Sequence, residues 1–189
     1  MKFTPTRISG AWIIQLEPRT DDRGLFARAF CEAEFAGRNL CVSWPQHNLS
    51  VTRGMGMIRG LHYQIEPASE TKVVRCVAGR VWDVVVDLRR DSSTFGQWES
   101  VELDAARGRA LYLPDGCAHG FQCLSDECAL YYLMSSPYSP EHARGLRWDD
   151  PMLAIDWPMR DRARVGSRDS ALPFFDRGPW GEPKEPSGK

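Results

Sequence analysis

The stretch KVVRCVAGRVWDVVVDLR, from Lys72 to Arg89, decides the fold class of this chain. Valines make up much of it, and β-branched side chains fit the pleated surface of a sheet better than a helix. The pair Ala78-Gly79 lies near its middle and has the composition of a tight turn. The segment therefore predicts two β-strands joined as a hairpin.

Further strand-like runs follow at short intervals and are separated by polar, glycine or proline turns. They are SVELD from Ser100, RALYLP from Arg109, GFQCL from Gly120 and ALYYLM from Ala129. Many short strands at this spacing indicate a sandwich or a barrel. Helical signals are few, and the best is CEAEFAG from Cys31. We expect a mainly β protein with a few short helices.

The length of 189 residues and the 42% hydrophobic content suit one domain with a single core. The strand pattern decays from about Pro158, and the end, DRGPWGEPKEPSGK, is rich in proline and glycine. We therefore expect one domain over residues 1–174 and a loose tail over 175–189.

The charge is balanced, with 24 Lys+Arg against 25 Asp+Glu, so the chain lacks the broad positive field that nucleic acid or an anionic membrane requires. The six cysteines include no CxxC pair, and several lie in apolar strand-like runs. No apolar stretch is long enough for a signal peptide or a membrane span. We expect a cytoplasmic protein that binds neither nucleic acid nor membrane.

Two sets of spaced glycine, histidine and proline residues resemble the two motifs of the cupin barrels. In the first, five residues separate Gly56 from His62, Gln64 follows, and six residues separate Lys72 from Gly79. The second has five, one and two residues between Gly108, Pro114, Gly116 and His119. In cupins the histidines of facing strands point into one cavity. The resemblance implies a cupin-like double-stranded β-helix, or jelly-roll barrel.

In metal-binding cupins these motifs supply histidines and a glutamate to a divalent cation. The corresponding set here is His62, Gln64, Lys72 and His119. A lysine ammonium has only donors and repels a metal ion, and a glutamine amide replaces imidazole poorly. We therefore expect no metal and no other cofactor. A fixed cation instead suits a reaction that develops negative charge on oxygen, such as enolate formation.

Longer segments resemble the dTDP-4-dehydrorhamnose 3,5-epimerase family. Besides the Lys72–Arg89 stretch they are NLSVTRGMGMIRGLHYQ from Asn48, STFGQW from Ser93, LYLPDGCAHGFQCL from Leu111, YSPEHARGLRWDDP from Tyr138 and IDWP from Ile155. DDRGLFAR near the start and RDSALP from Arg168 fit the outer motifs, so the resemblance covers roughly residues 3 to 174. It implies a homodimeric barrel that inverts carbons beside the C4 ketone of a nucleotide-diphospho-6-deoxy sugar. Such an enzyme needs no cofactor and serves rhamnose, deoxysugar or O-antigen polysaccharide synthesis.

The resemblance also assigns catalytic roles by position. His62 would remove the proton alpha to the ketone, with Asp169 hydrogen-bonded behind it. Lys72 would stabilise the enolate oxygen, and Tyr132 would return a proton from the opposite face of the sugar. Because side chains alternate along a strand, only one of Tyr131 and Tyr132 faces the core.

The substrate-binding residues follow in the same way. Arg59 and Arg23 would clamp the diphosphate as guanidinium forks, with Arg23 reaching over from the partner subunit of a homodimer. The remaining pocket residues would be Phe26, Arg28, Gln46, Asn48, His119 and Tyr138. Each residue also has a plainer interpretation: the histidines as core residues, Lys72 as a surface lysine and Arg23 as part of a solvated turn.

Several positions depart from the family pattern. Arg28 stands where a glutamate associated with thymine recognition is usual, and a guanidinium, which only donates, suits cytosine or guanine better. Alternatively, Arg28 turns outward and pairs with Glu32. Leu49 replaces a usual histidine, Leu133 a usual lysine, and GSRD stands for SxKD. The alternatives that stay open are a one-carbon epimerase, a ketoisomerase on the same barrel, and an inactive sugar-nucleotide-binding barrel.

Overall fold

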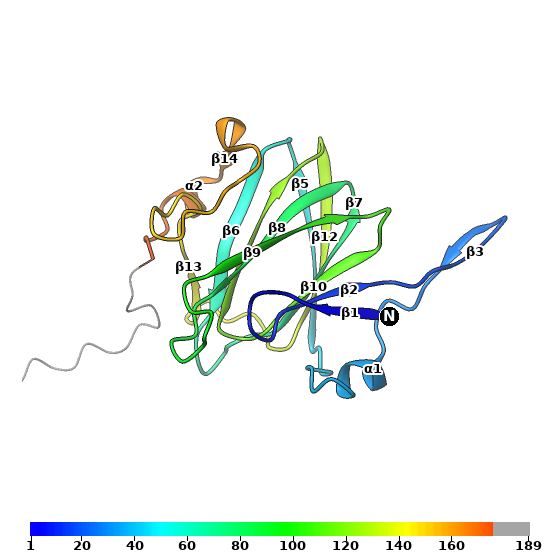
Figure 1. The fold of residues 1–189 in the computed structure, drawn as a ribbon. Coiled ribbons are helices and arrows are strands. Elements are labelled where there is room, and N and C mark those ends of the chain that lie inside the picture. The colour runs from blue at the N-terminus through cyan, green and yellow to red at the C-terminus, as the bar shows by residue number, and fades with distance from the viewer. Residues whose placement is uncertain (176–189) are drawn as a thin grey trace, which may run out of the picture.

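The computed structural model describes residues 1–175, which form two large β-sheets, a two-stranded β-hairpin and a few short helices (Figure 1). The first sheet contains, in spatial order, β1 (Lys2–Pro5), β2 (Trp12–Gln15), β10 (Arg109–Leu113), β7 (Lys72–Ala78), β12 (Glu127–Met134) and β5 (Gln46–Arg53). The second contains β13 (Ala143–Gly145), β6 (Met57–Gln64), β11 (Cys117–Cys123), β8 (Arg80–Asp87) and β9 (Trp98–Asp104), with β14 (Arg164–Val165) parallel to β6. The predicted mainly β class is confirmed.

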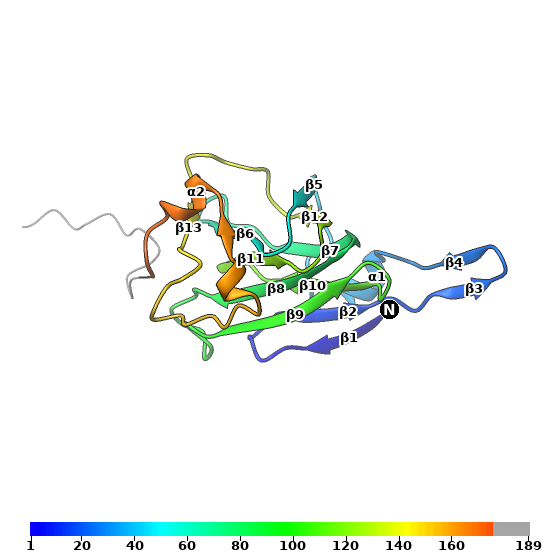
Figure 2. The same cartoon turned by 90° about the horizontal axis from the view of Figure 1, so that it is seen from above.

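The remaining elements lie around these sheets. Strands β3 (Arg19–Asp21) and β4 (Gly24–Phe26) form a hairpin that projects from the body of the molecule (Figure 2). The helices are α1 (Glu32–Ala36), where a helix was predicted, the 3-10 turn η1 (Arg160–Arg162) and α2 (Ser167–Ser170). No helix among residues 1–175 is long and apolar enough to cross a membrane.

The tail predicted for residues 175–189 lies outside the described residues, apart from Phe175. This first residue packs against Phe95, with ring centroids 5.8 Å apart, and is buried. The backbone N–H of Phe175 donates to the Asp150 carboxylate. The packed part of the chain therefore includes residue 175.

The prediction of a hairpin over residues 72–89 is wrong in its pairing. Both strands exist, but β7 pairs with β10 and β12, whereas β8 pairs with β11 and β9. Gly79, at φ +69°, turns the chain from one sheet into the other, and a Cβ there would lie 2.2 Å from the Glu127 carbonyl oxygen. Pairing with other strands thus overrides the local turn signal, because β7 and β8 each have another strand as partner on both sides.

The main core lies between the two sheets and takes apolar side chains from both. The first sheet contributes Val74, Leu111 and Leu130, and the second contributes Val85 and Phe121. All five are at most 2% exposed. Burial of such side chains stabilises the folded state by about 1.5–3 kcal/mol each. A separate cluster on the first sheet packs Phe35 of α1 against its neighbours Val73 and Tyr112, so α1 covers part of that sheet's outer face.

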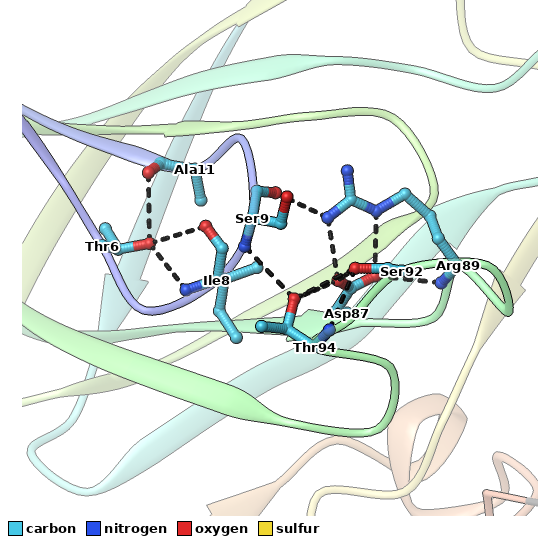
Figure 3. Close-up of polar contacts among 8 residues, drawn as sticks. All are labelled: Thr6, Ile8, Ser9, Ala11, Asp87, Arg89, Ser92 and Thr94. Carbon is cyan, nitrogen blue, oxygen red and sulfur yellow. Dashed lines mark hydrogen bonds and ion pairs between the residues drawn. The ribbon is translucent and has the colours of Figure 1, made fainter.

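A buried polar network joins the β1–β2 turn to the β8–β9 connection (Figure 3). Asp87 is fully buried and accepts hydrogen bonds from Arg89 Nε at 2.9 Å and Thr94 Oγ1 at 2.6 Å, and a further one from Ser92. Arg89 Nη2 also donates to the Ser9 carbonyl at 2.6 Å. Burial opposes ionisation of Asp87, but these donors outweigh it and hold the pKa of the carboxyl below its ordinary value.

Candidate active site

His62 on β6 and Asp169 on α2 form a hydrogen-bonded pair, with His62 Nε2 2.8 Å from Asp169 Oδ1. The second carboxylate oxygen accepts the Gly60 N–H at 3.0 Å. The His62 side chain is 44% exposed and that of Asp169 only 11%. Burial opposes ionisation of Asp169, yet the hydrogen bonds from His62 and Gly60 hold its pKa below its ordinary value. A charged carboxylate therefore fixes an accessible imidazole.

The chain segment after the last long strand brings Asp169 to β6. Strand β14 runs parallel to β6, with Val165 opposite Ile58, and α2 follows after Gly166. Sequence reasoning alone selected Asp169 only through the family pattern, because its segment is short and polar. The β14–β6 pairing supplies the structural reason for its position.

A second histidine–carboxylate pair lies deeper in the fold. His119 on β11 stands directly opposite His62 on β6, and its Nε2 lies 2.9 Å from Asp83 Oδ2 on β8. Both side chains are buried. Burial raises the pKa of Asp83, and the neighbouring His119 only partly offsets this. The other oxygen, Asp83 Oδ1, has no hydrogen-bond partner among the described residues.

Asp83 was missed by sequence reasoning, although a signal for it exists. In VWDVVVD the side chains alternate between the two faces of the strand, so Asp83 shares the inward face of Val81 and Val85. An acidic residue at an inward position is rarely left unpaired. Its position thus pointed to a buried cationic or donor partner, which the fold supplies as His119.

Lys72 lies at the start of β7 and is 6% exposed, so the interpretation as a surface lysine is wrong. Its Nζ donates to the backbone carbonyl of His62 at 3.2 Å and lies 2.9 Å from Glu70 Oε1. The ammonium is therefore tied to the residue that carries the exposed imidazole. A cation held at this residue can stabilise negative charge that develops on a nearby oxygen.

Tyr132 on β12 faces the interior, and its ring lies 5.8 Å from that of His119 in an edge-to-face arrangement. Its neighbour Tyr131 faces outward and bonds His47 Nδ1 at 2.8 Å. Burial, reinforced by the nearby Asp83 carboxyl, raises the pKa of Tyr132 well above its ordinary value. The phenol therefore retains its proton at neutral pH and can donate it.

Two adjoining cavities flank His62. One, of about 400 Å³, is lined by His62, Tyr138 and Arg168 and by further residues that include Gln46, Asn48, Gln64 and Glu70. The other, of about 370 Å³, is lined by residues that include Thr52, Arg59, His62, Arg168 and Asp169. The structure thus brings predicted residues Gln46, Asn48, Arg59 and Tyr138 to the exposed imidazole. Arg168 lines both cavities and was not selected from the sequence; the nearby Tyr138 hydroxyl raises the pKa of its guanidinium.

Both the oxygen and the nitrogen of the Gln64 side-chain amide make hydrogen bonds within the protein. Its Oε1 accepts the Ser139 N–H at 2.6 Å, and its Nε2 donates to the carbonyls of Ala68 at 2.9 Å and Pro137 at 3.2 Å. The side chain thus holds the segment that carries Tyr138. Among residues 1–175, no group of three or more His, Cys, Asp and Glu is arranged to hold a metal ion. The absence of a metal in the protein stays a prediction.

Within a single chain, the predicted residues on and beside the β3–β4 hairpin do not lie at His62. Arg23 is exposed and pairs with Asp21, and Phe26 is 77% exposed on the projecting hairpin (Figure 2). Arg28 lies just beyond it, with Nη1 3.2 Å from Glu34 Oε1. Its ionic partner is thus Glu34 and not Glu32, because α1 begins only at Glu32.

The chain is similar to known proteins over most of its length. Residues 5–177 match the family model described as dTDP-4-dehydrorhamnose 3,5-epimerase. The chain is 44% identical over 158 residues to the dTDP-4-dehydrorhamnose 3,5-epimerase of Methanothermobacter thermautotrophicus, covering 84% of each chain. It is also 45% identical over 161 residues to the dTDP-4-dehydrorhamnose 3-epimerase of Streptomyces niveus, covering 84% of this chain and 76% of the relative.

The fold is similar to that of solved structures as well. One is the dTDP-6-deoxy-D-glucose-3,5-epimerase of Legionella pneumophila, in complex with dTDP-4-keto-L-rhamnose. The match has a TM-score of 0.86 and 34% sequence identity and covers 92% of each chain. The match to the family model, over residues 5–177, includes the strands that carry His62, Lys72, His119 and Tyr132.

Proposed function

Because this chain belongs to the dTDP-4-dehydrorhamnose 3,5-epimerase family, we propose that it is an isomerase that inverts carbons C3 and C5 of a dTDP-linked 4-keto-6-deoxy sugar. The substrate is of the dTDP-4-dehydro-6-deoxyglucose type and the product of the dTDP-4-dehydrorhamnose type. The reaction serves rhamnose or related deoxysugar synthesis.

The observation that carries the proposal is the exposed His62 held by the buried Asp169 carboxylate at 2.8 Å. Since Nε2 faces Asp169, the Nδ1 atom of the ring is left for the substrate. The developing imidazolium is stabilised by the adjacent carboxylate, as general base catalysis requires. The cavities on both sides of His62 give a sugar access to it.

In the proposed reaction His62 removes the proton from the carbon alpha to the C4 ketone. The electron pair of the broken C–H bond forms the C=C bond of the enolate, and the ketone oxygen becomes negatively charged. Lys72 stabilises that oxygen. Tyr132 then donates its proton to the same carbon from the opposite face, and the C=O bond forms again. Inversion follows because the acid and the base act on opposite faces of the ring.

The diphosphate needs cations. Arg59 lines the same cavity as His62, and we propose that its guanidinium binds the diphosphate. Arg23 is too remote within one chain, so we propose that the partner subunit of a homodimer supplies it. Leu25 and Phe26 of the projecting hairpin are 67% and 77% exposed. The outer face of the first sheet also exposes apolar side chains, namely Leu49, Val51, Val77 and Tyr131. Burial of these surfaces against a second copy would complete both sites.

We also place the enzyme in the cytoplasm. All six cysteines are free, and four of them are buried. Reduced thiols in this number suit a reducing compartment. Nucleotide-activated sugars as substrates fit the same location.

A single-carbon epimerase is the second candidate, favoured by the similarity to the Streptomyces niveus 3-epimerase. Turnover of the dTDP-linked 4-keto sugar in heavy water, followed by NMR, separates the two. Deuterium at both C3 and C5 is expected. Deuterium at one carbon alone would establish the single-carbon enzyme. Movement of the ketone away from C4 would establish a ketoisomerase. No exchange and no product would reject an epimerase and leave a binding protein.

A further inference from the structure

Glu70, which no step above uses, lies next to the reacting groups. It precedes β7 in the loop that follows β6, is 6% exposed and lines the cavity of His62 and Tyr138. Its Oε1 atom lies 2.9 Å from Lys72 Nζ, and both side chains are almost fully buried, at 6% and 7% exposed. A carboxylate is rarely buried without a partner, and here its cationic partner is Lys72.

The donors of Lys72 show what this pair does. An ammonium group has three N–H donors. One is directed at Glu70 Oε1 and one at the His62 carbonyl. A lysine side chain has four flexible carbon–carbon torsions, and two acceptors in different directions fix the position of Nζ. Among the described contacts, one of the three N–H donors is left without an acceptor.

We propose that Glu70 is a positioning residue for the reaction: it holds the Lys72 ammonium in place, so that its remaining donor meets the enolate oxygen. The inference rests on the proposed function, because it needs a reaction in which charge develops on that oxygen. Preorganised donors act strongly because they need no reorientation as the charge develops.

The negative charge of Glu70 has a second effect that opposes the first. A carboxylate beside Lys72 weakens the field that the ammonium exerts on a nearby enolate. Burial decides which effect is larger. Because water does not reach the pair, a Lys72 ammonium without Glu70 has to bond another protein acceptor, and its Nζ moves away from its position. We therefore expect loss of the carboxylate to slow the reaction and not to accelerate it.

The test is a double-mutant cycle in the full-length enzyme with Glu70→Gln, Lys72→Met and the combined variant. Glu70→Gln alone should lower kcat by about 10- to 100-fold, the scale expected when a catalytic group is displaced by about 1 Å. Its KM should change by less than about threefold, because Lys72 acts when the enolate forms. In the Lys72→Met background the same substitution should change kcat by less than about twofold.

Glu66→Gln is the matched control. Glu66 belongs to the same loop but is exposed and accepts a hydrogen bond from Ser69 Oγ at 2.7 Å. It should leave kcat unchanged. Thermal unfolding of every variant separates positioning from folding. If Glu70→Gln does not fold, Glu70→Asp, which keeps the charge on a shorter side chain, takes its place in the cycle under the same criteria.

Equal losses of kcat in both backgrounds would show a general structural role and overturn the proposal. So would an unchanged or increased kcat in Glu70→Gln, or a rise in KM alone. An inactive wild type would reject the proposed function together with this inference, whereas an active wild type with additive losses rejects Glu70 alone.

Discussion

Replacing Asp169 by asparagine removes one charge from the site and keeps the size of the side chain. The carboxylate accepts from both His62 Nε2 and the Gly60 N–H. An amide has one oxygen and one NH₂ group, so it can accept from only one of these donors and presents a donor to the other. The variant therefore loses the negative charge behind the imidazole and also one of two hydrogen bonds.

The size of the effect follows from the burial of the pair. A hydrogen bond to a charged group contributes about 1.5–3 kcal/mol. Because the Asp169 side chain is only 11% exposed, most of this contribution applies, although the 44% exposure of His62 allows water to screen part of the charge. At about 1.4 kcal/mol per factor of ten, kcat should fall by roughly 10- to 150-fold. KM should change little, since the charge matters most when the imidazolium forms.

The assay is turnover of the dTDP-linked 4-keto sugar, with kcat and KM determined separately. The control is Asp161→Asn, which alters an exposed acid in the same C-terminal part of the chain and should have no effect. A variant with an unchanged kcat, or with a higher KM only, would refute the role of Asp169 as the partner of the base.

The same substitution has a defined pH signature in stability. The folded pKa of Asp169 lies below its ordinary value of 3.8, so its ionised form stabilises the fold above that pH. The stabilisation is lost as the pH falls through the folded pKa. The difference in unfolding free energy between wild type and Asp169→Asn, measured by denaturant titration, should therefore shrink as the pH falls below 3.8.

Four further outcomes are expected. Tyr132→Phe should keep deuterium exchange at the substrate but lose inversion, because the base remains and the acid is gone; equal loss of both in an NMR assay would contradict separate roles. Asp87→Asn should lower the unfolding free energy by about 2–3 kcal/mol, because Arg89 loses a buried anionic partner, while kcat stays unchanged; a denaturant titration shows whether stability is instead unaffected. Prolonged treatment with a chelator should leave full activity, because Lys72 repels cations; inactivation that added metal reverses would reject this. Arg28→Gln should change the ratio of kcat/KM between dTDP- and CDP-linked substrates by less than about twofold, because Arg28 pairs with Glu34 and does not contact the base. Loss of a hydrogen bond to the base would change this ratio by more than about twofold. A selective loss of the CDP-linked substrate would place Arg28 in the base pocket.

Much of the site could be predicted from the sequence because its residues lie on strands. Lys72, His119 and Tyr132 belong to β7, β11 and β12, whose alternating apolar side chains identify them locally. The alternation also separates Tyr132, which faces inward beside His119, from Tyr131, which faces outward. The class of fold and the kind of residue in the cavity are thus properties of short segments.

Three features depended on the tertiary structure. Strands β7 and β8 follow each other across Gly79, yet they belong to different sheets. Asp83 meets its donor partner His119 only when β8 pairs with β11 in the second sheet, and Glu70 is buried beside Lys72 only where the β6–β7 loop enters the first sheet. Asp169 reaches His62 across 107 residues through the pairing of β14 with β6. Side-chain periodicity reports which face of a strand is buried, but pairing partners are chosen by the register and packing of the whole molecule, and no local pattern encodes that choice.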